Sequence, residues 1–368
     1  MVKSLLFFTF CWFFAYVIAN RSFSVKMRNR AFNLEELYTS KMSYWGVVLI
    51  AALCSYYNFS VTDGVIGYGS DRKNYLYAFE NGRFEGVGLM FLMDIIHSFN
   101  GEFNSLLYLS TFVSVAFVLL AYRFSRDATP QALLLFFLSP FVFQTFTALK
   151  QCYANGFAAL AIMLLFQKRS IRKDIICILL IILACLFHSA GYLMIPLFIL
   201  LKLNIKIDKP SKLFIVPALF VIFFKSIILA IADVSNSVLP LLSAKIMEYF
   251  GEENIEEEQS VVILLKGLPY YYISYIGVKY RNLLKLKIQD FDKYLLISLI
   301  GSLFYLTTIY DPWMRRVTDI LTFAIFVFWS NVICFVPHSN DKRRIELILM
   351  GLFTYRWLIM IYVNFGKF

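Results

Sequence analysis

Apolar runs follow one another along almost the whole chain, and they restrict its fold more than any other feature. Most of the runs hold about 16 to 22 residues, and a helix of that length crosses roughly 30 Å of hydrocarbon. A backbone inside a bilayer must satisfy its own hydrogen bonds, which favours helices. We therefore expect about 12 transmembrane helices, at 4–20, 43–58, 103–122, 132–149, 151–166, 174–188, 190–203, 213–232, 261–279, 294–310, 314–334 and 345–365.

The composition agrees with this interpretation and excludes an ordinary soluble domain. Hydrophobic residues make up 60% of the chain and charged residues 16%, and the mean hydropathy is +0.69. Soluble domains carry about 25% charged residues. We expect an all-α polytopic membrane protein that forms a single integral membrane domain over residues 1–368.

The positive charge is concentrated in particular loops, so the net charge of +11 does not indicate a nucleic-acid partner. Most lysines and arginines lie in alternate connections, which the positive-inside rule places in the cytoplasm. These connections are 20–42, 123–131, 167–173, 202–212, 279–293 and 336–345. The connection at 233–260 is acidic and is expected outside the cell.

The apolar stretch 86–99 is too short to span the bilayer. If this stretch crossed the membrane fully, the basic connections 20–42 and 123–131 could not both lie on the cytoplasmic side. We therefore predict a short interfacial or re-entrant helix, external loops at about 59–102 and 233–260, and external termini.

Four external segments gather polar side chains at one surface of the predicted bundle. They are the predicted loop GYGSDRKNYLYAFENGRFEG (67–86), the helix start ALKQCYANG, the turn FHSAG, and YDPWMRRVTD. External cations beside the bilayer run against the charge bias of the loops, and ionisable groups near membrane depth are candidates for function. A lone histidine at a turn can equally be a satisfied interfacial residue, and end-of-helix cations often reach to headgroups. The candidates are Asp71, Arg72, Lys73, Tyr75, Glu85, Lys150, Gln151, His188, Arg315 and Arg316.

A lipid diphosphate is an anionic headgroup tied to the bilayer, and arginine or lysine both binds it and stabilises it as a leaving group. Tyrosine offers a flat surface and a hydroxyl to sugar rings, although most of the 23 tyrosines are expected to be interfacial belt residues.

Asp319 follows Arg315 and Arg316 by four and three residues, a spacing that predicts a structural ion pair on one helix.

The same segments resemble the O-antigen and exopolysaccharide polymerases of the Wzy/EpsG type. The resemblance lies in GSDRKNYLYAF with EGVGLMFL, in ALKQCYANGFAALAIMLLFQKRS, in LACLFHSAGYLMIPLFIL and in RRVTDILTFAIFVF. It covers most of residues 45–335, and it implies a GT-C-like fold in the bacterial inner membrane.

The resemblance implies a glycosyltransferase that joins undecaprenyl-diphosphate-linked repeat units at the outer face of that membrane and releases undecaprenyl diphosphate. It implies no nucleotide sugar, metal or other cofactor, and a chain-length regulator as a possible partner. His188, Asp71 or Glu85 would accept the proton of the attacking hydroxyl, and the sequence leaves the choice among them open. Lys150 stands where the family has arginine, and no basic residue lies between Met42 and Asp71, so Arg72, Lys73, Lys150, Arg315 and Arg316 would hold the diphosphate.

Two other classes stay open. A flippase for lipid-linked sugars would need polar groups along a path through the membrane and internal repeats, whereas the polar residues here concentrate at one surface. A membrane O-acyltransferase would use His188 with an aspartate or asparagine partner deeper in the membrane and a route to a cytoplasmic acyl donor.

Overall fold

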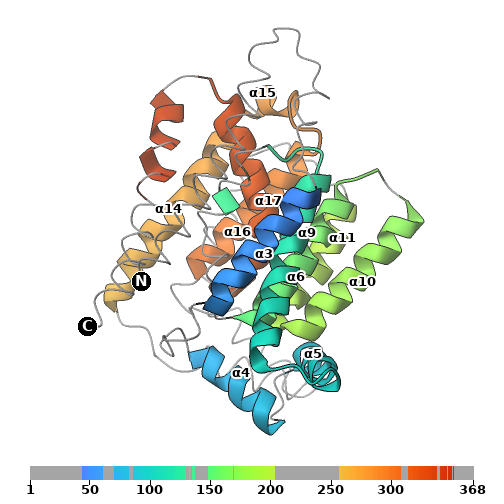
Figure 1. Cartoon of the computed structure of the whole chain (residues 1–368). Coiled ribbons are helices and arrows are strands. Elements are labelled where there is room, and N and C mark those ends of the chain that lie inside the picture. Colours follow the sequence, from blue (N-terminus) through green and yellow to red (C-terminus); the bar gives the residue numbers. More distant parts are fainter. Residues whose placement is uncertain are drawn as a thin grey trace, which may run out of the picture.

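The computed structural model describes residues 44–60, 70–82, 86–129, 132, 135–136, 148–168, 170–203, 257–307, 314–337, 340–345, 347–349 and 351. All regular elements in this part of the chain are helices (Figure 1). They are α3 (Tyr44–Ser60), α4 (Ser70–Asn81), α5 (Val87–Ser98), α6 (Phe103–Phe124), α9 (Leu149–Leu165), α10 (Ile171–Phe187), the 3₁₀ helix η1 (Ser189–Leu193), α11 (Met194–Lys202), α14 (Glu257–Lys279), α15 (Arg281–Lys285), α16 (Phe291–Thr307) and α17 (Met314–Phe335).

Eight of the predicted runs coincide with described helices. The runs at 43–58, 103–122, 151–166, 174–188, 190–203, 261–279, 294–310 and 314–334 become α3, α6, α9, α10, η1 with α11, α14, α16 and α17. The runs at 4–20 and 213–232 lie outside the described residues, as do most of 132–149 and 345–365. The all-helical fold class is therefore confirmed for the part of the chain that the structure describes.

Two helices in this part are long and apolar enough to cross a membrane by length and composition: α6 and the Thr318–Phe335 portion of α17. Shorter apolar helices occupy Val87–Ser98, Leu149–Leu165 and Ser189–Lys202. Beyond Arg172 in its first turn, the side chains that α10 exposes are also apolar, among them Ile175, Leu179, Ile182 and Leu186. A helix that contacts lipid tails presents such a face, because hydrocarbon solvates it as well as a protein core does.

The segment 67–86 was predicted as a loop, and there the prediction was wrong: residues 70–81 form α4. Tyr75, Ala78 and Phe79 follow the helical spacing of three and four residues, and all three are buried. They pack with Leu106 and Leu149 in a small apolar cluster. The polar composition between these positions hides the pattern, because the helix exposes most of its surface. Residues 257–260, placed in the second external loop, also belong to a helix, the start of α14.

The helix predicted at 86–99 is present as α5. Figure 1 views α5 nearly along its axis, whereas α6 and α9 run up the picture, so α5 lies crosswise at one end of the bundle. His97 fixes α5 to α4: its ring stacks on Phe79 with centroids 4.0 Å apart, and its Nε2 donates to the Phe79 carbonyl at 3.0 Å. The crosswise orientation is the one an interfacial helix adopts.

Helix α9 lies at the centre of the bundle and packs on α6, α10 and α17. Nearly all of its side chains are buried, because alanine and glycine at 154, 156, 158, 159 and 161 let the neighbouring helices approach closely. A Cβ at Gly156 would lie 3.2 Å from the Cβ of Phe117 on α6. The position of the start of α9 is therefore well determined by its neighbours.

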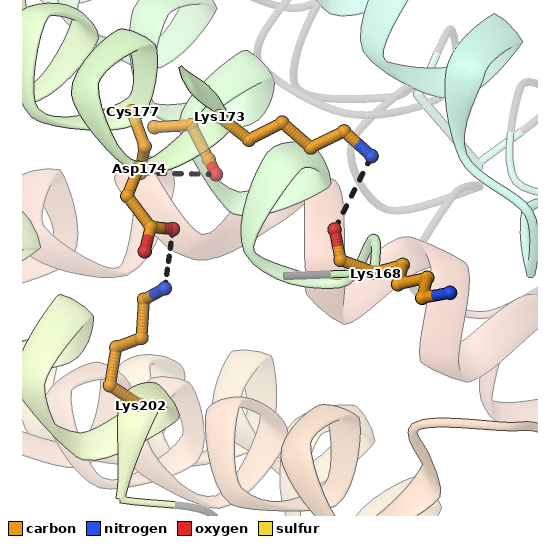
Figure 2. Close-up of polar contacts among 6 residues, drawn as sticks. Lys168, Lys173, Asp174, Cys177 and Lys202 are labelled. Carbon is orange, nitrogen blue, oxygen red and sulfur yellow. Dashed lines mark hydrogen bonds and ion pairs between the residues drawn. The ribbon is translucent and has the colours of Figure 1, made fainter. Parts of the chain in front are cut away.

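The described basic connections gather at the end of the bundle opposite α4 and α5, near α15 in Figure 1. Arg126 pairs with Asp290 across 3.5 Å, which joins the connections 123–131 and 279–293. Lys202 pairs with Asp174 (Figure 2), which joins the end of α11 to the start of α10. Lys279 pairs with Asp341 across 2.5 Å. This end is called the basic end below, and its opposite the pocket end.

Candidate functional site

A pocket of about 190 Å³ opens at the pocket end of the bundle. Liquid water occupies roughly 30 Å³ per molecule, so the pocket has room for a small polar headgroup. Segments far apart in the sequence contribute its walls: α4, the start of α9, the turn after α10, and the start of α17. The lining residues are Asn74, Tyr75, Ala148, Lys150, Gln151, His188 and Arg316.

Lys150 and Tyr75 join α9 to α4 at the edge of this pocket. The Lys150 ammonium lies over the Tyr75 ring, 5.5 Å from its centroid, a geometry in which the ring face attracts the cation. Tyr75 is buried in the apolar cluster that also holds Leu149. The aromatic ring thus helps to hold the cation at the pocket.

Gln151 connects α9 to the start of α17. Its Nε2 donates to Asp319 Oδ2 at 3.1 Å and to the backbone carbonyl of Arg316 at 3.4 Å. Gln151 itself is 3% exposed, so both bonds form in a water-poor environment where they are strong. The amide therefore fixes the backbone that carries Arg316 relative to Lys150.

The turn FHSAG positions His188 through its two flanking residues. Phe187 ends α10 and stacks on Tyr153 of α9, with ring centroids 4.4 Å apart. Gly191 lies so close to α10 that a Cβ there would be 2.6 Å from the carbonyl carbon and oxygen of Ala184. Only glycine allows this approach, which folds η1 back onto the helix that precedes it and leaves His188 at the pocket.

His188 caps both helices of the turn. Its backbone N–H donates to the Ala184 carbonyl at 3.0 Å, and its Nδ1 accepts a hydrogen bond from the Ala190 backbone N–H at 3.1 Å. Burial lowers the pKa of His188 to about 4, and the positive charges of Arg316 and Lys150 act in the same direction. The ring is accordingly neutral at pH 7.

The start of α9 adds to the positive character of the pocket. The N-cap, Ala148, makes no side-chain capping bond, and it lines the pocket together with the first turn. A helix N-terminus carries about half a positive charge and presents backbone N–H groups. With Lys150 and Arg316, it makes a pocket suited to an anion.

The structure brings together five of the sequence-predicted site residues in this pocket: Tyr75, Lys150, Gln151, His188 and Arg316. Asp319 is not among these five pocket residues, and it accepts a hydrogen bond from Gln151. The side chain of Arg315, one of the two partners predicted for Asp319, lies outside the described residues.

Of the other predicted residues, only Lys73 has a described side chain, and it is not among the described residues that line the pocket. Lys73 is exposed on α4. Asp71 and Arg72 belong to the first turn of α4, where the structure describes the backbone alone, and Glu85 lies outside the described residues.

Sequence reasoning missed Asn74 and Ala148, which also line the pocket. Asn74 lies between Lys73 and Tyr75 in a segment interpreted as a loop. Had the spacing of Tyr75, Ala78 and Phe79 been taken as helical, Asn74 would have been expected beside Tyr75 at the exposed border of that helix. Ala148 contributes through its position before the helix start, for which its side chain gives no signal. In the described residues no cluster of His, Cys, Asp or Glu side chains is arranged to hold a metal ion.

Comparison with known proteins gives one match. The model of the EpsG family matches residues 43–367, nearly the whole chain, whereas no curated protein and no solved structure matches. The matched region contains all four segments that suggested the resemblance, and it includes every residue of the pocket. The chain belongs to the EpsG family.

Proposed function

We propose that the protein is a polysaccharide polymerase that joins undecaprenyl-diphosphate-linked oligosaccharide repeat units at the outer face of the bacterial inner membrane. The observation that carries this proposal is the pocket lined by Lys150, Arg316, His188, Gln151 and Tyr75 in a member of the EpsG family. The pocket combines two cations with a helix N-terminus, and a lipid diphosphate is an anion that a membrane-embedded enzyme meets at the surface of the bilayer.

In the proposed reaction, a hydroxyl at the non-reducing end of one lipid-linked glycan attacks the anomeric carbon of another. The bond between that carbon and the diphosphate oxygen breaks, its electron pair stays on the diphosphate, and a new glycosidic bond forms. The hydroxyl proton passes to a base. The products are a longer lipid-linked glycan and undecaprenyl diphosphate, so no further reactant is required.

Lys150 and Arg316 would stabilise the charge that develops on the departing diphosphate. Preformed charges aimed at a developing anion are often the largest contribution to catalysis. Arg72, Lys73 and Arg315 come from the same two segments and are proposed as further contacts to the diphosphate, and Tyr75 as a contact to the diphosphate or a sugar. The base is proposed among Asp71, Glu85 and His188. Of the two carboxylates, Asp71 has the better-supported position, since α4 brings Asn74 and Tyr75 into the pocket one helical turn after it.

The bilayer would hold both substrates with their headgroups at one depth, which reduces the entropic cost of their meeting. We propose about 12 spans in a GT-C-like arrangement, with the basic end in the cytoplasm and the pocket end outside. Two observations support this orientation: the described basic connections meet at one end, and α5 lies crosswise at the other (Figure 1). A chain-length regulator would bind from within the same membrane.

The reaction is tested with purified protein in lipid, in the presence of EDTA, and an authentic undecaprenyl-diphosphate repeat unit. The expected result is a ladder of longer lipid-linked glycans together with released undecaprenyl diphosphate. A folded protein that produces no ladder would contradict the proposal. Movement of the repeat unit across the bilayer would then favour a flippase, and an acylated product would favour an acyltransferase.

The orientation is tested separately with two exposed lysines at opposite ends. Lys73→Cys on α4 should react with a membrane-impermeant maleimide in intact spheroplasts, whereas Lys287→Cys beside α15 should react after permeabilisation only. The unsubstituted protein supplies the background labelling of the native cysteines. The reverse pattern would place the pocket on the cytoplasmic side and exclude polymerisation at the outer face.

A further inference from the structure

We infer that His188 acts as a neutral hydrogen-bond donor, through Nε2–H, to the lipid diphosphate, and that it is not the general base. The inference rests on the proposed function and deepens it, because it assigns one role to a residue for which the sequence left two. It starts from the turn that carries His188 and from the charges that share its pocket.

The tautomer of His188 is determined by the backbone. The Ala190 N–H donates to Nδ1 at 3.1 Å, and a ring nitrogen that accepts a hydrogen bond carries no proton. In a neutral imidazole the proton then resides on Nε2. The bond also caps η1, so the alternative tautomer would place two N–H groups against each other and leave the first turn of η1 uncapped.

The surroundings keep the ring neutral. Lys150 and Arg316 line the same pocket, and the start of α9 contributes the positive end of its dipole. Burial and these two charges lower the pKa of His188 to about 4. A base must gain a proton during the reaction, and here the resulting imidazolium would be buried next to two cations, while its Nδ1 is already occupied by a main-chain donor.

A donor role agrees with each of these observations. Nε2–H can donate to a diphosphate oxygen, and this bond strengthens as the carbon–oxygen bond to the sugar breaks and the electron pair moves to the diphosphate. His188 keeps its proton throughout. The proton of the attacking hydroxyl passes to a carboxylate instead, so the base is Asp71 or Glu85.

Ring ¹⁵N spectroscopy tests the tautomer independently of activity. The chain has three histidines, and the His188 signals are assigned by their loss in His188→Gln. With ¹⁵N-histidine-labelled protein in lipid at pH 7, we expect an unprotonated Nδ1 and a protonated Nε2. Addition of undecaprenyl diphosphate should shift the Nε2 signal and leave Nδ1 unprotonated. A protonated Nδ1, or bound undecaprenyl diphosphate that leaves Nε2 unchanged, would overturn the inference.

Three substitutions separate the two functions of the ring. Glutamine can place an amide donor near the position of Nε2 but cannot act as a base, whereas asparagine can accept from the Ala190 N–H but is too short to reach the pocket. Alanine does neither. We expect His188→Gln to keep polymer formation within about tenfold of the unsubstituted enzyme, and the Asn and Ala variants to lose roughly 100-fold, the usual effect of removing one donor to a developing anion.

Once the unsubstituted enzyme forms a ladder, the activities of these variants distinguish a hydrogen-bond donor from a base and from a structural cap. If folded His188→Gln is as inactive as His188→Ala, a titratable group is needed and the inference is wrong. If His188→Asn is fully active, the ring serves the cap alone and the inference is also wrong. Failure of the unsubstituted enzyme to polymerise would contradict the proposed function, and the ¹⁵N tautomer would still decide the state of the ring.

Discussion

The two ends of the bundle use positive charge differently. At the basic end, lysine and arginine meet aspartate: Lys285 pairs with Asp292 at 2.7 Å and Lys293 with Asp290 at 2.9 Å. At the pocket end, the Lys150 ammonium lies over a tyrosine ring and shares its pocket with Arg316 and a histidine. Carboxylates pair with the first set of charges at the surface, whereas the second set lines a pocket beside an aromatic ring and a histidine.

The difference shows how the same residue types serve two purposes. Exposed ion pairs stabilise a protein by about 0.2–1 kcal/mol each, so the basic end contributes to loop packing and to orientation in the membrane. A cation that lines a pocket can act directly on an anion bound there. Substitutions of matched type at the two ends should therefore differ sharply in effect.

The largest effect is expected from Arg316→Ala, with Arg126→Ala at the basic end as its control. Loss of a charge directed at the leaving diphosphate should lower polymerisation roughly 100-fold or more, whereas Arg126→Ala should stay within about twofold because its partner, Asp290, also pairs with Lys293. The length and amount of polysaccharide in cells with equal protein levels measure both. Equal effects of the two variants would remove the distinction between the ends.

Gly191→Ala should act next most strongly, through structure. Its Cβ would overlap the Ala184 backbone, so the turn must move, at a cost of about 1–3 kcal/mol, and His188 leaves the pocket. We expect a lower melting temperature together with a loss of polymer. Gly351→Ala, where a Cβ meets nothing within 4 Å, is the control and should melt and polymerise normally.

Gln151→Ala tests whether Gln151 positions Arg316 for binding of the diphosphate. Without the amide, Asp319 and the Arg316 carbonyl lose a buried donor, which costs about 1–3 kcal/mol, and Arg316 is less well fixed relative to Lys150. We expect weaker binding of undecaprenyl diphosphate in a calorimetric titration and a lower turnover, by about tenfold. Gln167→Ala, at the other end of α9 and in contact with Met163, should leave binding unchanged.

Lys150→Arg tests whether the charge or the residue type matters. The sequence resemblance implies arginine at this position, and arginine stacks on aromatic rings at least as well as lysine, so polymer formation should stay close to that of the unsubstituted protein. Lys150→Met retains the length but removes the charge and should lower polymer formation by about tenfold. Full activity of the Met variant would exclude Lys150 from the diphosphate site.

The smallest effect is expected from Lys285→Ala. Arg281 also lies within 3.9 Å of Asp292, so the carboxylate keeps a partner, and we expect a stability change below about 1 kcal/mol and unchanged polymer length. Thermal unfolding in detergent and the cellular assay measure this. A large loss of polymer would show that the basic end takes part in the reaction.

Much of this arrangement could be predicted from the sequence, because membrane helices need long apolar runs and leave their polar residues at the ends. The residues Lys150, Gln151, His188 and Arg316 were recognisable for this reason, as polar groups beside hydrophobic segments. Helix α4 was missed because its buried positions, three among the side chains that the structure describes, lie in a segment too polar to stand out. The link from Gln151 to Asp319 joins residues 168 positions apart, and such a contact depends on how α9 packs against α17.

The bond from Ala190 to His188 has a further consequence for how the chain can vary. The proton on the imidazole is directed by a main-chain N–H, which every residue except proline supplies. Glycine or serine at position 190 would fit the buried turn and leave the chemistry of His188 intact, whereas proline would remove the donor and free the ring to exchange its proton between the two nitrogens. The chemical state of the histidine is thus encoded in the path of the backbone, where a comparison of side chains alone would not reveal it.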